Sequence, residues 1–327
     1  MTSYSPELKP VTVPSSGVRA GQQATVRRDP VRLLQLALAG LWLLDAILQF
    51  QAPMFTKAFA RMLDSSAAGN PAFVATPIRM SARLIAQHPT VTNAVFALVQ
   101  LLLALGIGWR PTLRFALASS VVWSAAVWWL GEGLGGVLSG SASPVNGAPG
   151  PAILYALLAV LLWPGRRDRE APFAAGQFTG PSVARVLWIA LWGSLALFAL
   201  LPATSAPGAL ARMISSASAS QPAWLSALDA HLATFLASQG PIAAFVGASA
   251  LFAVAVGICL PMPASRAAPI VAIVIALVLS VAQGLGGILI GSSTDPGSGP
   301  LLALIALCYW QPRPKDGEAA MTTQRSA

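Results

Sequence analysis

The sequence predicts an all-α membrane protein with about eight transmembrane helices, arranged as two parallel four-helix repeats. Three observations support this fold class. The chain is 55% hydrophobic and only 9% charged, whereas soluble proteins contain about 25% charged residues. Apolar runs long enough to cross lipid recur along all 327 residues. Motifs of the first half also return in the second half at a fixed offset.

The expected spans are apolar runs that approach the roughly 20 residues a helix needs to cross about 30 Å of hydrocarbon. Turns at Arg110-Pro111 and Pro261-Met262-Pro263 separate adjacent spans, because proline interrupts a helix. The fourth and eighth runs are short, so we expect them to begin inside the glycine-rich loops before them. The eight runs are 32–50, 91–109, 112–136, 150–164, 184–202, 241–260, 267–290 and 298–311.

These spans divide the chain into five segments. The first is a polar tail that contains several prolines, and its composition predicts disorder. We expect a cytoplasmic N-terminal tail at 1–31, a first four-helix repeat at 32–165, a cytoplasmic linker at 166–183, a second four-helix repeat at 184–312 and a cytoplasmic C-terminal tail at 313–327.

The distribution of lysine and arginine predicts the orientation. With the N-terminus inside the cell, fifteen of these residues fall on inner segments and five on outer segments. Positive charge is enriched on the cytoplasmic side of membrane proteins, so both termini are expected there. The net charge of +9 does not indicate nucleic-acid binding, since the basic residues are scattered between apolar runs and form no single basic face.

One offset relates the two halves. Residues 59–63 (Phe-Ala-Arg-Met-Leu) align with residues 210–214 (Leu-Ala-Arg-Met-Ile), which lie 151 positions later. The same offset aligns Gly-Leu-Gly-Gly at 133–136 with Gly-Leu-Gly-Gly at 284–287. The alternative is convergence between helices rich in alanine and glycine, but arginine and proline positions match as well. We infer duplication of a four-helix unit, and an even number of spans per unit makes the repeats parallel.

The long outer segments at 51–90 and 203–239 mix apolar and charged residues. This pattern predicts short amphipathic helices that lie at the outer interface or cap the bundle. Methionines and histidines in these segments match no metal-ligand spacing, so no metal site is predicted. The two cysteines lie near the expected cytoplasmic side, where a structural disulfide is not expected.

Ionisable residues in apolar segments are the candidates for function, because they are costly in lipid. Asp45 lies inside the first span, and Glu132 lies near the outer end of the third at a similar depth. Two close carboxylates would raise the pKa of one and hold a proton, which suits proton-linked chemistry or a quinol headgroup. In the alternative, Asp45 bonds a neighbouring helix and Glu132 pairs with Arg79 or Arg83, fixing the cap. Gln283 is the repeat counterpart of Glu132.

The glycine-rich stretches are interpreted as packing and turn residues. Small residues four positions apart let helices approach closely in lipid. The stretches are no phosphate-binding loop, because the lysine and serine or threonine that would follow are missing. The glycines expected to serve packing are Gly131, Gly135, Gly136, Gly140, Gly287 and Gly291.

The residues 44–51, 129–140 and 150–151, with weaker echoes at 283–291, resemble DoxX/DoxD-type membrane proteins. Residues 48–55 and 128–136 are also similar to an uncharacterised family of bacterial multi-pass membrane proteins. The DoxX/DoxD resemblance implies a protein of the bacterial plasma (inner) membrane. It further implies a redox enzyme as partner and a quinone as ligand, since some DoxD relatives are membrane subunits of a thiosulfate:quinone oxidoreductase. The cysteine pairs of some redox relatives are absent here, which puts a thiol mechanism in doubt.

The leading hypothesis is therefore a non-catalytic membrane subunit or accessory of a redox or quinone-linked system, embedded in the lipid bilayer. The second is a small-molecule or proton-coupled transporter with its site between the repeats. A third is an enzyme acting on a lipid or quinone, with Asp45 and Glu132 as acid and base. No complete catalytic motif is present, so no catalytic residue is assigned and an enzyme is the least favoured of the three.

Overall fold

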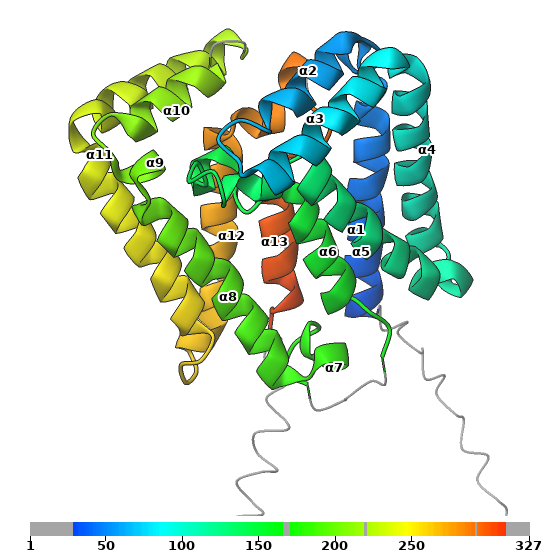
Figure 1. Cartoon of the computed structure of the whole chain (residues 1–327). Helices are drawn as coiled ribbons and strands as arrows, with labels where there is room; N and C mark the ends of the chain where they lie inside the picture. The colour runs from blue at the N-terminus through cyan, green and yellow to red at the C-terminus, as the bar shows by residue number, and fades with distance from the viewer. Residues whose placement is uncertain (1–28, 166–170, 219–220, 292, 312–327) are drawn as a thin grey trace, which may run out of the picture.

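The computed structural model describes residues 29–165, 171–218, 221–291 and 293–311 (Figure 1). The described residues form helices and turns without a β-strand, which confirms the all-helical class. The expected tails fall largely outside them, as do residues 166–170 of the expected linker. Among the described residues, six helices are long and apolar enough to cross a membrane: α1 (Pro30–Leu48), α4 (Pro89–Gly108), α5 (Leu113–Leu130), α8 (Pro181–Leu200), α11 (Ala223–Gly257) and α12 (Ala264–Ala282).

Two further apolar helices are shorter than the spans expected at 150–164 and 298–311. These are α6 (Pro151–Leu161) and α13 (Ser298–Cys308), each of 11 residues. At 1.5 Å per residue each is about 16 Å long, roughly half the thickness of the hydrocarbon core. Each begins directly after a turn that ends in a glycine with positive φ, Gly150 before α6 and Gly297 before α13. Both lie in the middle of the bundle.

The helices pack as two groups. In the first half, residues 29–165, α1 packs on α4, α4 on α5 and α5 on α6. In the second half, residues 171–311, α8 packs on α11, α11 on α12 and α12 on α13. The short helices α6 and α13 contact each other and join the halves, and α1 also contacts α13 (Figure 1). The first and last described residues lie at the same end of the bundle.

The opposite end carries helices that lie across the bundle, as the amphipathic outer segments predict (Figure 1). They are α2 (Lys57–Ser65), α3 (Ala72–Gln87) and α10 (Ala209–Ser218). Helix α3 buries Val74 and Ile78 against the bundle and exposes Phe73 and Leu84. Such a helix covers the bundle with one face and leaves the other to its surroundings.

The two halves differ at the junction between cap and span. The sequence predicts a break before a span at 241–260, but α11 runs through Pro241 as one helix of 35 residues. Proline is tolerated inside membrane helices when neighbouring groups satisfy the backbone. In the first half the chain does break at His88 (φ −137°, ψ 60°), because the residue before a proline avoids the helical conformation and Pro89 follows.

The glycines expected to bring helices together lie instead at the ends of helices and in tight turns. Gly131 ends α5, and Gly135, Gly136, Gly140, Gly287 and Gly291 all have positive φ. A Cβ at Gly135 would overlap the carbonyl oxygen of Pro149. The close approach is therefore between a turn and the loop before α6, and not between two helix faces. A turn has this shape only where the backbone can adopt positive φ, which glycine does without strain.

Each half sends a loop onto the other. In the second half, the backbone N–H of Ser293 donates to Gln51 Oε1 at 3.1 Å. In the opposite direction, Gln283 Nε2 donates to the carbonyl oxygen of Pro144 at 2.9 Å. We call residues 293–297 and 143–147 the exchanged loops. This exchange brings residues of the second half to the candidate site of the first.

Candidate functional site

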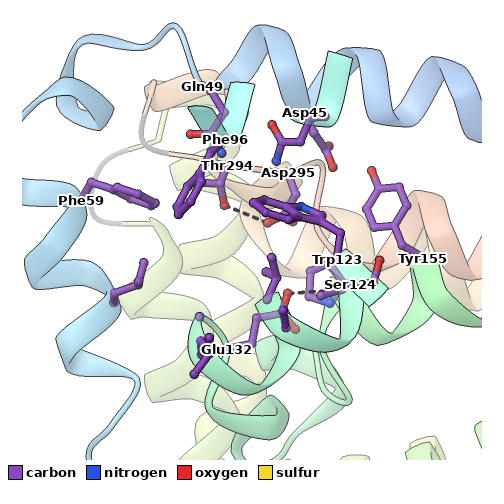
Figure 2. A pocket seen from close by; sticks show the side chains of 18 of the residues that line it. Asp45, Gln49, Phe59, Phe96, Trp123, Ser124, Glu132, Tyr155, Thr294 and Asp295 are labelled. Atoms are coloured by element: carbon purple, nitrogen blue, oxygen red, sulfur yellow. Dashed lines mark hydrogen bonds between the residues drawn. The ribbon is translucent and has the colours of Figure 1, made fainter. Parts of the chain in front are cut away.

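The first half encloses a cavity of about 300 Å³ (Figure 2). Helices α1, α4, α5 and α6 form its walls, α2 and α3 cover it, and one exchanged loop reaches into it. We call it the acidic cavity. Its polar and aromatic lining residues are Trp42, Asp45, Gln49, Phe59, Ser81, Phe96, Gln100, Trp123, Ser124, Glu132, Tyr155, Thr294 and Asp295.

One face of α1 supplies the first carboxyl group. Trp42, Asp45 and Gln49 are three and four residues apart, so they lie on the same side of the helix. Asp45 is only 2% exposed. The indole Nε1 of Trp42 donates to Ser120 Oγ at 3.1 Å, which fixes the ring against α5. The carboxyl group is thus held within the bundle and directed at the cavity.

The turn after α5 supplies the second carboxyl group, that of Glu132. The backbone N–H of Ala152, in the first turn of α6, donates to Glu132 Oε1 at 2.9 Å. Such N–H groups have no partner inside the helix and favour a negative charge. A Cβ at Gly150 would overlap Glu132 Oε2. The small residue before α6 therefore leaves room for the carboxyl group, while one of its oxygens remains available to the cavity.

The exchanged loop of the second half supplies the third carboxyl group, that of Asp295. Asp295 Oδ1 accepts from the N–H of Gly297 at 2.8 Å, and Oδ2 accepts from Thr294 Oγ1 at 3.0 Å. Because the loop is also tied to Gln51, Asp295 is held at the wall of the first half (Figure 2). The cavity is therefore built from both halves of the chain.

Aromatic rings form much of the remaining lining. The Tyr155 ring on α6 stacks on Trp42, with 4.2 Å between centroids, and its hydroxyl points toward Asp45 (Figure 2). Across the cavity, Phe96 contacts Trp123 edge to face at 5.4 Å between centroids. Phe96 contacts Phe59 in the same way at 6.0 Å, which ties the cap to α4.

Seven buried polar atoms at this cavity have no hydrogen-bond partner among the described residues. Buried polar groups in native proteins are normally paired, and one left unpaired costs about 1–3 kcal/mol. A group of such atoms around one cavity indicates that a ligand or water completes the bonding. The atoms are Asp45 Oδ1, Gln49 Oε1, Gln100 Oε1, Trp123 Nε1, Ser124 Oγ, Glu132 Oε2 and the Tyr155 hydroxyl.

Among the residues that the structure describes, no lysine, arginine or histidine lines the acidic cavity. Buried carboxyl groups that face no basic partner hold protons or take up positive charge.

The structure brings together only part of the polar cluster predicted from the sequence. Asp45 and Glu132 line the same cavity. Arg79 and Arg83 lie on the exposed side of α3 and are not among the lining residues. Gln283 lies at a second hollow in the other half, where its amide bonds Pro144 and Ser298.

The sequence interpretation missed several lining residues. The polar residues on α1 and α4 carried a usable signal, since Gln49 follows Asp45 by one helical turn and Gln100 follows Asn93 by two. Asp295 carried none, because it reaches the cavity only through the exchanged loop. Among the described residues, no three His, Cys, Asp or Glu side chains are placed to hold a metal ion.

No family model, curated protein or solved structure matches the chain. The fold and the cavity place it in the class of integral membrane proteins, with several helices able to cross a bilayer. Within that class, its distinguishing feature is a small cavity whose lining, as far as the described residues form it, has three carboxyl groups and no basic side chain. The DoxX/DoxD family membership stays a prediction.

Proposed function

We propose that the chain is a small-molecule or proton-coupled transporter of the bacterial inner membrane whose ligand site is the acidic cavity. The observation that carries this proposal is the set of seven buried, unpaired polar atoms around one cavity. Ionisable groups inside membrane proteins are costly and mark substrate, ion or proton pathways. Asp45, Glu132 and Asp295 supply three such groups at one place.

The proposed topology has eight spans in two parallel repeats, with both termini in the cytoplasm. Each short helix, α6 or α13, would complete a crossing together with the glycine-rich turn before it. Irregular backbone is tolerated at membrane depth where it is buried in protein or lines a cavity. Leu134 and Leu285, which are 151 residues apart, share a positive φ in these turns and support the proposed duplication.

Proton flux into proteoliposomes under an imposed membrane potential tests the proposal. We expect the Asp45→Asn variant to lose at least about tenfold in flux, because one proton-binding group of the path is removed. The matched control is Asp64→Asn, which removes an exposed carboxyl group on α2. Equal flux through the wild type and the Asp45→Asn variant would contradict proton coupling at this site.

A second candidate is a membrane subunit of a quinone-linked redox system, as the DoxX/DoxD resemblance implies. Trp123 Nε1, Ser124 Oγ and the Tyr155 hydroxyl are unpaired donors, and quinone carbonyls are acceptors. Purification from native membranes in mild detergent, followed by mass spectrometry, tests this candidate. A stoichiometric quinone with a redox enzyme supports it, and a lone protein without quinone contradicts it.

A further inference from the structure

The lining of the acidic cavity is unbalanced in charge. Asp45, Glu132 and Asp295 contribute carboxyl groups from three different segments, and no basic side chain of the described part of the chain lines the cavity with them. Four of the seven unpaired atoms are carboxyl or amide oxygens, which accept hydrogen bonds. An anionic ligand would be repelled by these carboxyl groups, whereas a positively charged group would find acceptors and opposite charge together.

The aromatic rings around the carboxyl groups add a second attraction. Trp42 and Tyr155 form one group of rings. Phe96 forms another with Trp123 and Phe59 (Figure 2). The faces of such rings attract cations, and tryptophan does so most strongly. Rings also bury the apolar part of an amphipathic ligand.

Two other cationic occupants fit less well. A bare metal ion needs several ligands within about 2–2.6 Å, and no three suitable side chains are so placed among the described residues. A basic side chain of the chain itself could also fill the cavity, but Arg79 and Arg83 lie on the exposed face of α3 and do not reach it. The cavity volume of about 300 Å³, at the lower end of the range for small-ligand pockets, suits a small molecule.

We propose that the acidic cavity binds a small aromatic or aliphatic amine cation, with its ammonium group drawn to the carboxyl groups of the lining and its apolar part against the rings. This inference rests on the proposed function, in which the cavity is the ligand site. It adds the chemical class of the ligand.

Three labelled probes of one shape test the class on the full-length protein in detergent. They are 2-phenylethylammonium, propylbenzene, in which a methyl group replaces the charged ammonium group, and 2-phenylethanesulfonate, which is an anion. We expect saturable binding of the cation, at least about tenfold tighter than binding of the neutral probe. The Glu132→Gln and Asp295→Asn variants should each weaken cation binding, and the control Asp64→Asn should not.

The outcomes separate the inference from the proposed function. Equal or tighter binding of the neutral probe or the anion at this site would overturn the cation class and keep the cavity as a ligand site. Absence of binding for all three probes would overturn both. Size-exclusion chromatography of each variant establishes that it is folded. Retention of full cation affinity in both folded carboxyl variants would also overturn the inference.

Discussion

The two halves of the molecule each contain a hollow of similar volume, about 300 Å³ in the first and about 360 Å³ in the second. The first is lined by three carboxyl groups and five aromatic rings. The second is lined by Val145, Asn146, Met213, Ser216, Gln283 and Gly286, none of them charged or aromatic. Volume alone therefore does not distinguish a candidate site, and the side chains that face the hollow do.

The offset of 151 allows the two halves to be compared residue by residue. Asp45 corresponds to Ala196, which is buried in the apolar core, and Gln100 corresponds to Leu251 in the same core. Glu132 corresponds to Gln283, whose amide oxygen accepts from Ser298 and whose nitrogen donates to Pro144. The second half thus pairs or replaces these particular polar groups of the cavity. Unpaired groups cost stability, so the gathering of seven such atoms around one cavity is best explained by a ligand.

The largest expected effect on stability comes from changing the residues at the equivalent positions 45 and 196. Ala196→Asp would bury a carboxyl group among apolar side chains without a partner, and should lower the free energy of unfolding by roughly 3 kcal/mol or more. The reverse change, Asp45→Ala, should raise it by about 1 kcal/mol, because it removes an unpaired polar group. Thermal unfolding in detergent measures both. Equal losses in the two variants would contradict the asymmetry.

A smaller effect is expected at the glycine turns. Gly135→Ala should cost about 2–3 kcal/mol, because the new Cβ overlaps the Pro149 carbonyl in addition to the strain of positive φ. Gly140→Ala is the matched control, with positive φ but open space at the Cβ, and should cost about 1 kcal/mol. The same unfolding assay compares them. A loss at Gly140 as large as at Gly135 would show that the turn is not packed as described.

Much of the fold follows from local patterns in the sequence. Apolar runs and prolines predict the long helices, because each depends on residues close together in the chain. The same reasoning identifies Asp45 and Glu132, since an ionisable residue in an apolar segment is conspicuous. The sequence also carries a signal that the interpretation did not use. The buried side of α3 is marked by Val74, Ile78, Ala82 and Ile85, and this spacing places Arg79 and Arg83 on the other side of the helix.

The rest depends on contacts between distant residues. Gln51 and Ser293 are 242 positions apart, and their bond is what places Asp295 at the cavity. No periodicity within either segment reports such a contact. The continuity of α11 through Pro241 also depends on packing, in this case with α8 and α10, which overrides the local tendency of proline to end a helix.

The exchanged loops have a consequence for stoichiometry. If each half were a separate chain, its cavity would be completed only by a partner, and the site would exist only above the dissociation constant of the dimer. In one chain the second half is always present, at an effective concentration on the order of millimolar. In a single chain the two halves can also differ in sequence, whereas the subunits of a homodimer cannot. One loop can carry Asp295 to a charged cavity while the other, with Pro144, serves to anchor Gln283.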